Sequence, residues 1–148
     1  MELLATVTAI GVLYVAWQQW QTNKDRLRLE LFDKRFAIYD ATRTFLANVI
    51  TDGKVKEEKW RAFRLATREA EWLFGSSVYR FIEKEICSRV LDYQRLTSEL
   101  EGSFPEETRD EDRREIIAQR NEISTFMKKS FDELPCRFKP YLDITKPL

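Results

Sequence analysis

The longest apolar segment lies at the start of the chain. No side chain between Glu2 and Lys24 is charged, and residues 3–20 are mostly apolar. About 20 apolar residues at 1.5 Å per residue match the roughly 30 Å hydrocarbon core of a bilayer. The pattern therefore predicts that residues 1–23 form one transmembrane helix.

Basic residues on one flank give this segment a direction. Lys24, Arg26 and Arg28 follow it closely, whereas only Glu2 precedes it. Basic residues stay on the cytoplasmic side of a membrane. We therefore expect the N-terminus outside the bacterial inner membrane and residues 24–148 in the cytoplasm.

Two other interpretations of the apolar segment compete with a membrane span. A cleaved signal peptide is disfavoured, because the segment lacks a basic n-region and a small-x-small cleavage site. A buried core helix of a soluble domain is the stronger alternative, since the segment is near the lower length limit and ends in Gln18, Gln19 and Gln21. The membrane anchor is favoured over both.

The segment from Asn23 to Ile50 has the pattern of a long amphipathic helix. It contains no proline or glycine, and nothing between Trp20 and Leu27 breaks a helix, so the span is predicted to continue into it. Two apolar stripes run along it: Leu29, Phe32, Phe36, Tyr39, Leu46 and Ile50 form one, and Leu31, Ile38 and Phe45 form the other. A face this wide predicts one stripe inside the domain and the other against a sister subunit.

Three more helices and a docked tail are predicted after Gly53. Apolar spacing predicts helices at about 56–74, ended by Gly75, and at about 78–100. A fourth helix has a solvated start in 106–115 and an apolar face from Ile116 to Leu134, where Pro135 is expected to end it. The tail residues expected to dock on the bundle are Phe138, Tyr141, Leu142 and Ile144.

These elements define the predicted fold class. It is all-α, with an N-terminal transmembrane helix over 1–23 continuous with the long helix of a cytoplasmic four-helix bundle over 24–148. We see no strand signal, no internal repeat and no low-complexity segment.

Composition removes most enzymatic and metal-dependent functions from consideration. The chain has 25 basic and 25 acidic residues, so no global field attracts nucleic acid. It has no histidine, and P-loop, GxGxxG, CxxC, HExxH and GxSxG motifs are missing. We expect no enzyme activity, metal or cofactor. Cys87 and Cys136 are expected to be reduced and buried.

The best candidate for ligand contact is a local group of cations on the second predicted helix. Arg61, Arg64 and Arg68 fall at i, i+3 and i+7 and would share one helix face. Guanidinium groups bind phosphate oxygens, and Trp60 offers a stacking surface for a base. This pattern predicts contact with oligonucleotide phosphates and bases, with a weaker version of the signal at Lys128 and Lys129.

A solvated face is the competing interpretation of these arginines. They would then pair with acidic neighbours, and on charge balance alone this interpretation is favoured. The candidate partners are Glu57, Glu58, Glu69 and Glu71.

Association of several spans would create a second kind of site. If the spans surround an axis, Thr8 and Val12 are candidates for the inner wall, and Gln18, Gln19 and Gln21 for a polar mouth. In a plain tether, the same glutamines would simply lie in the headgroup region.

Three segments after the anchor give the chain a resemblance to a known protein class. They are RLRLELFDKRFAIYDATRTFLANVI, TREAEWLFG and FDELPCRFKPYLDI. With them the chain resembles small bacterial single-span helical membrane proteins, some of which look like anti-phage effectors. These include the channel effector of the Hailong type and CRISPR-associated membrane proteins that bind cyclic oligonucleotides.

The resemblance implies an architecture and a class of function. A cytoplasmic helical domain assembles into a homo-oligomer, often a tetramer, and binds a single-stranded or cyclic oligonucleotide made by a signal-producing partner protein. The ligand then controls ion flow through bundled N-terminal helices. The alternative function is a membrane-tethered module that binds a protein partner and conducts nothing.

Overall fold

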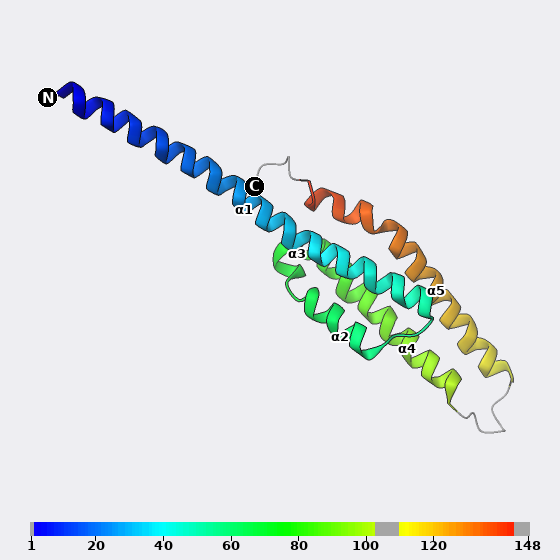
Figure 1. Cartoon of the computed structure of the whole chain (residues 1–148). Coiled ribbons are helices and arrows are strands. Elements are labelled where there is room, and N and C mark those ends of the chain that lie inside the picture. The colour runs from blue at the N-terminus through cyan, green and yellow to red at the C-terminus, as the bar shows by residue number, and fades with distance from the viewer. Residues whose placement is uncertain (1, 103–109, 144–148) are drawn as a thin grey trace.

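One helix runs from the N-terminus into the centre of the fold. The computed structural model describes residues 2–102 and 110–143, with side chains described from Gly11 onwards. Helix α1 spans Glu2–Asp52 as 51 continuous residues, and its N-terminal part extends beyond one end of the helical bundle (Figure 1). At 1.5 Å per residue such a helix is roughly 75 Å long. The predicted continuity between the apolar start and the first bundle helix is confirmed.

The other elements pack around the C-terminal half of α1. They are α2 (Glu57–Ala66), α3 (Ala70–Arg80), the π-helix η1 (Phe81–Cys87), α4 (Ser88–Glu101), α5 (Asp110–Phe138) and the 3₁₀-helix η2 (Lys139–Tyr141). In the view of Figure 1, α5 lies on one side of α1 and α2 on the other. Across the described residues the fold is all-helical, which confirms the predicted helical bundle.

The apolar start of α1 was predicted to cross a membrane. Over the residues that the structure describes, no helix combines the length and the hydropathy that a bilayer crossing needs. This finding does not support the transmembrane part of the predicted fold class, which stays a prediction.

The second predicted helix, at 56–74, is wrong as a single element. Helix α2 ends at Ala66, and a turn closed by the Ala70 N–H and the Thr67 carbonyl, 3.0 Å apart, leads into α3. Thr67 is buried and closes the last turn of α2, because its hydroxyl and its N–H both donate to the carbonyl of Phe63, at 2.9 and 3.0 Å. Gly75 does interrupt the helix as predicted, with a φ of 68° that favours glycine.

Pro135 does not end the last helix, contrary to prediction. Helix α5 continues through it to Phe138, which is fully buried. The centroid of the Phe138 ring lies 5.4 Å from that of Tyr39 and 5.1 Å from that of Phe74. These tertiary contacts stabilise the helix beyond the proline. The predicted docking of the tail is confirmed for Phe138 and for the half-buried Tyr141 and Leu142, whereas Ile144 lies outside the described residues.

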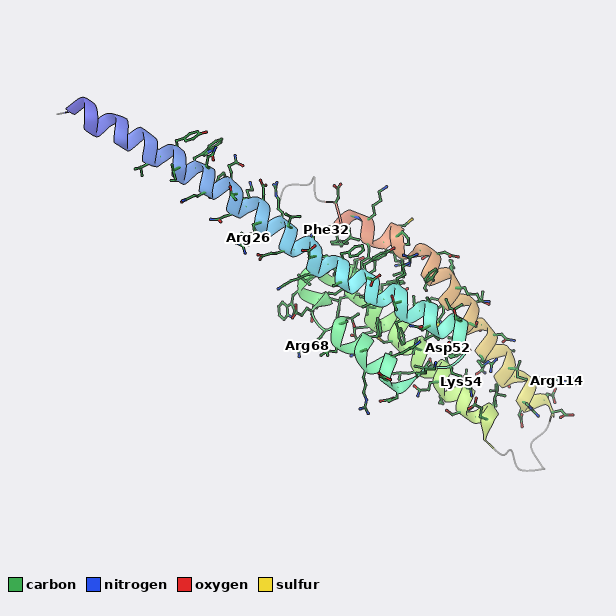
Figure 2. All side chains as sticks on the ribbon, in the orientation of Figure 1. Arg26, Phe32, Asp52, Lys54, Arg68 and Arg114 are labelled. Atoms are coloured by element: carbon green, nitrogen blue, oxygen red, sulfur yellow. The ribbon has the colours of Figure 1, made fainter. Side chains whose placement is uncertain are left out.

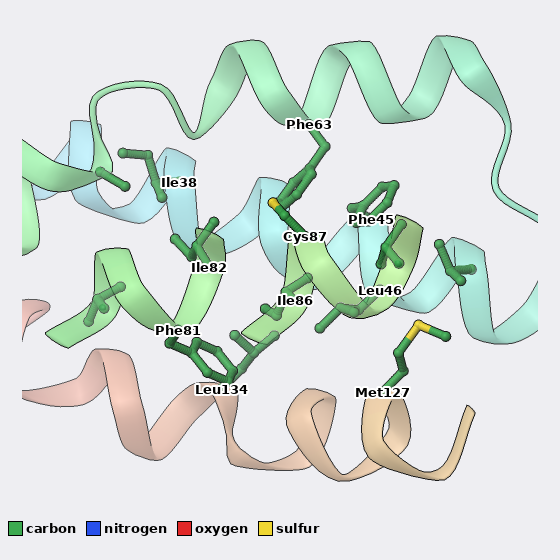
Figure 3. Close-up of a cluster of buried hydrophobic side chains, with 14 of the residues drawn as sticks. Ile38, Phe45, Leu46, Phe63, Phe81, Ile82, Ile86, Cys87, Met127 and Leu134 are labelled. Atoms are coloured by element: carbon green, nitrogen blue, oxygen red, sulfur yellow. The ribbon is translucent and has the colours of Figure 1, made fainter. Parts of the chain in front are cut away.

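The hydrophobic core lies between α1, α2, α3, η1, α4 and α5. Figure 3 shows its centre, to which α1 contributes Ile38, Phe45 and Leu46 and α5 contributes Met127 and Leu134. In η1 the adjacent pairs Phe81–Ile82 and Ile86–Cys87 are all buried, because a π-helix brings residues five apart onto one face. Of the two predicted stripes on α1, Ile38 and Phe45 therefore face the core.

The other stripe on α1 is divided between core and surface. Leu46 is fully buried and Tyr39 is half-buried, but Leu29 and Phe36 are 54% and 45% exposed. Part of the apolar face predicted to meet a sister subunit is thus left uncovered by the described chain.

Replacing Leu46 tests the position of α1 in this core. We expect Leu46→Ala to lower the free energy of unfolding by about 2–5 kcal/mol, because a fully buried side chain leaves a cavity. Leu65→Ala is the matched control, since Leu65 is 71% exposed. Urea unfolding followed by circular dichroism measures both, and equal effects of the two changes would contradict this packing.

Candidate functional site

The three arginines predicted to share a helix face do not do so. Arg61 and Arg64 lie on α2, but Arg68 follows the end of this helix at Ala66. Figure 2 shows Arg68 at the turn between α2 and α3. The break at Thr67 therefore removes the uninterrupted i, i+3, i+7 face on which the prediction depended.

Two of these arginines are engaged by acidic side chains. The Arg61 Nε donates to Glu57 Oε1 at 2.8 Å, as the solvated-face interpretation expected. Arg64 pairs with Glu83 on η1, a partner that the sequence did not indicate. A phosphate ligand would have to compete with both carboxylates.

Trp60 is likewise used inside the fold. It is half-buried, with its ring centroid 5.7 Å from Phe45 and 6.0 Å from Phe63, and the Arg64 guanidinium lies 5.8 Å above it. These contacts occupy part of the ring surface that was predicted to stack on a base.

Lysines near the start of α2 are paired as well. Lys54 Nζ lies 2.6 Å from Glu101, and Lys56 and Lys59 lie 2.9 and 3.6 Å from the Asp52 carboxylate (Asp52 and Lys54 are labelled in Figure 2). The hydrogen bond from Lys56 is the main cause that lowers the pKa of Asp52. The lysines at this end of the bundle are therefore all in ion pairs with carboxylates.

The second pair of predicted cations lies on a different helix. Lys128 and Lys129 are exposed on α5, and Lys129 Nζ is 3.8 Å from Glu133. Because α5 and α2 lie on opposite sides of α1 in Figure 1, these lysines do not join Arg61 and Arg64 in one patch.

The two cysteines have different environments. Cys87 is buried, and the Arg64 Nη1 lies 3.3 Å from its Sγ, whereas Cys136 is exposed, so the prediction that both are buried is wrong for Cys136. Burial raises the pKa of the Cys87 thiol, an effect that Arg64 only partly opposes. In the Arg64 guanidinium burial acts to lower the pKa, but hydrogen bonds to Glu83 and Cys87 raise it overall.

The part of α1 that extends beyond the bundle has a polar side. Tyr14, Gln18 and Thr22 follow each other at four-residue spacing. Gln18 Nε2 donates to the Tyr14 hydroxyl, and the Thr22 hydroxyl donates to the backbone carbonyl of Gln18, both at 3.0 Å. A shallow groove lies along this side of the helix, and the side chains that line it are Tyr14, Val15, Gln18, Gln19, Thr22 and Asn23. Gln18 and Gln19 were predicted as pore residues, whereas Thr22 and Asn23 were not, and Tyr14 was expected at the membrane boundary together with Trp17 and Trp20.

The opposite side of the same segment is apolar. Leu13, Trp20 and Leu27 recur every seven residues, Trp17 lies beside them, and each is more than half exposed. Three helical turns beyond Leu27, the same side of α1 carries Ile38 into the bundle core. This side of α1 is therefore mostly apolar in its free part, where Lys24 Nζ lies 5.2 Å from the Trp20 ring centroid, and carries core residues in its packed part.

The remaining predicted pore residues lie on this free part of α1. Val12, Gln18, Gln19 and Gln21 are exposed. Thr8 lies in the helical backbone of α1, and its side chain is outside the described set. Among the described residues, no cluster of three or more acidic or cysteine side chains could hold a metal ion.

Comparisons of the chain with protein-family models, with curated proteins and with solved structures found no match.

The cysteine environments give a direct chemical test. At pH 8 we expect iodoacetamide to modify Cys136 readily and Cys87 many times more slowly, because the reactive species is the thiolate and burial disfavours it. Denaturant should equalise the two rates, measured by mass spectrometry of the peptides.

The raised pKa of Cys87 also sets the sign of a pH effect. Because the folded state favours the neutral thiol, the Cys87 thiol does not destabilise the fold below the ordinary thiol pKa of 9.0. The free energy of unfolding falls as the pH rises from that value through the raised pKa of the folded state, where the buried thiol must ionise. Equal labelling of both cysteines in the native protein would contradict this description of Cys87.

Proposed function

We propose that the protein is a homo-oligomeric, single-span membrane effector in which α1 helices surround an axis and form an ion-conducting path. The observation that carries the proposal is the division of the free part of α1 into a polar and an apolar side. A helix needs a different environment on each side when it has this pattern.

The apolar side fits a lipid environment. Leu13, Trp17 and Trp20 are exposed on a helix that extends beyond the bundle (Figure 1), so in water their apolar surface would remain hydrated. Two tryptophans near the basic residue Lys24 suit the boundary between hydrocarbon and headgroups. The exposed apolar side supports the predicted location in the bacterial inner membrane, with the bundle in the cytoplasm.

The polar side fits an axis shared by several copies. Gln18, Thr22 and Asn23 line it, and such groups inside a membrane face a bundle interior or a water-filled cavity. The bundle core lies on the apolar side of α1, so the bundles would extend outwards while the polar sides meet. Val12 and Gln19 flank the polar side, and Gln21 lies near the cytoplasmic mouth of the proposed pore.

The bundle is tied to α1 where the helix leaves it. The Arg35 Nε donates to the Leu73 carbonyl on α3 at 3.0 Å, and its Nη1 donates to the Tyr141 carbonyl on η2 at 3.1 Å. Since α1 is one continuous helix, a shift of α3 or η2 would act on the span through this side chain. This connection supports gating by the cytoplasmic domain.

The proposed gating signal is the oligonucleotide that the resemblance implies. Arg68, Lys128 and Arg61 are exposed cations on the bundle surface. The ion pairs of Arg61 and Arg64 leave Arg68 as the arginine of this group without a described carboxylate partner.

A tether without conductance is the alternative, and one feature of the surface favours it. Trp72 on α3 is 84% exposed and Leu65 on α2 is 71% exposed. Tryptophan is enriched at protein–protein interfaces, so Trp72 offers a contact to a protein partner. Replacing residues 1–23 by an unrelated membrane span distinguishes the two functions, because a tether would keep its activity and a channel would lose it.

Conductance in liposomes tests the channel directly. We expect ion flux from the purified protein, and a severalfold lower flux for Gln18→Leu with Thr22→Leu, which makes the polar side apolar. Trp17→Leu changes the opposite side and should leave the flux close to wild type. A monomer without flux would rule out the channel.

A charge reversal tests the oligonucleotide. We expect Arg61→Glu with Arg68→Glu to weaken binding of a fluorescent single-stranded oligonucleotide. The slope of log K against the logarithm of the salt concentration should become shallower by roughly 0.7 for each lost phosphate contact. Both residues are exposed, so the fold should persist. Arg95→Glu with Arg114→Glu is the control on α4 and α5, and equal losses in both variants would point to non-specific attraction.

A further inference from the structure

A groove on the bundle surface runs between α1 and α2. Its lining includes Ala37, Ala41 and Thr44 from α1 and Ala62 and Ala66 from α2, and its volume is about 380 Å³. All five side chains are small, so the two helices leave room between them for side chains of another molecule. We refer to this feature as the α1–α2 groove.

A rigid aromatic side chain projects from a neighbouring side of α1. Phe36 is 45% exposed although its ring lies 5.8 Å from Phe32 and 5.8 Å from Tyr39. The Tyr39 ring in turn packs 5.4 Å from the buried Phe138, so the row is anchored in the core. A side chain held in this way loses little conformational entropy on binding.

We propose that the α1–α2 groove receives Phe36 from a second copy of the chain, in a parallel ring of subunits. This inference rests on the proposed function, because a shared membrane span keeps the copies parallel. Phe36 and the groove residues Ala37 and Ala41 lie at nearly the same height on α1, within about 8 Å at 1.5 Å per residue. Parallel copies in register therefore place the projecting ring at the groove of their neighbour.

The angle between the two surfaces fits a closed ring. At about 100° per residue, Ala37, Ala41 and Thr44 lie roughly 80–140° around the helix from Phe36. A ring of four to six subunits needs about 90–120° between the two contact surfaces of each helix. The side of α1 between them continues towards the N-terminus as the polar side that carries Gln18 and Thr22.

Charges on the two surfaces are complementary. The groove lining contains Asp40 and one basic residue, Lys59, whose Nζ is already held by Asn48 Oδ1 at 2.6 Å and by the Asp52 carboxylate at 3.6 Å. Arg43 lies two helical turns after Phe36 on the projecting side, where its guanidinium is 5.9 Å from the Phe131 ring centroid. In the parallel ring, Arg43 of one copy faces Asp40 of the next, which favours this register over a shifted one.

Disulfide cross-linking in membranes tests the contact. In the full chain with Cys136→Ser, we expect Phe36→Cys with Ala41→Cys to form ladders of cross-linked subunits on mild oxidation. Phe36→Cys with Leu91→Cys is the matched control, because Leu91 is exposed on α4 away from the groove. Ladders in the control alone, or in neither variant while the protein is oligomeric in detergent, would overturn the proposal.

A charge exchange provides an independent readout that needs no cysteine. We expect Asp40→Arg and Arg43→Asp each to weaken the oligomer severalfold, and the double variant to recover it, as measured by native mass spectrometry. Two damaging single changes without recovery would exclude the pair. A wild-type monomer would overturn the proposed function itself, whereas an unaffected oligomer in all variants would overturn only the groove contact.

Discussion

The structure depends on the requirement that one uninterrupted helix satisfy two environments. Helix α1 carries Ile38, Phe45 and Leu46 into a protein core, and on the same side, towards the N-terminus, it exposes Leu13, Trp17 and Trp20. A helix cannot rotate about its axis at one end without rotating at the other. The packing of the bundle therefore fixes the directions in which the apolar and polar sides of the free part face.

Contacts at the end of the bundle keep that rotation fixed. Gly75 turns the chain after Leu73, and the carbonyl of Leu73 accepts a hydrogen bond from Arg35. The same guanidinium reaches Tyr141, and the rings of Tyr141 and Phe138 both pack against Phe74. α3, α5 and η2 thus meet around the point where α1 leaves the bundle, so a change in any of them would act on the free part of α1.

The sequence predicted the features that depend on apolar periodicity. The length and continuity of α1, the core positions in α4 and α5 and the docking of Phe138 follow from it, since burial of a stripe is a property of spacing. The break at Thr67 was missed because the apolar positions keep their phase across the turn. Pro135 was wrongly predicted to end the last helix, because the sequence pattern does not reveal the buried contacts of Phe138 that continue α5.

Features that depend on long-range pairing could not be predicted. Arg64 pairs with Glu83, which is distant in sequence and comes close only because α2 packs beside η1. The exposure of Cys136 and the groove between α1 and α2 likewise follow from the arrangement of the helices.

Accessibility of spin labels along α1 in lipid bilayers tests the central claim most directly. Nitroxides at Leu13 and Trp20 should be relaxed mainly by oxygen, which concentrates in lipid, and those at Gln18 and Thr22 mainly by a water-soluble nickel complex. Equal accessibility to the nickel complex at all four positions would show that this part of α1 lies in water and would contradict the account.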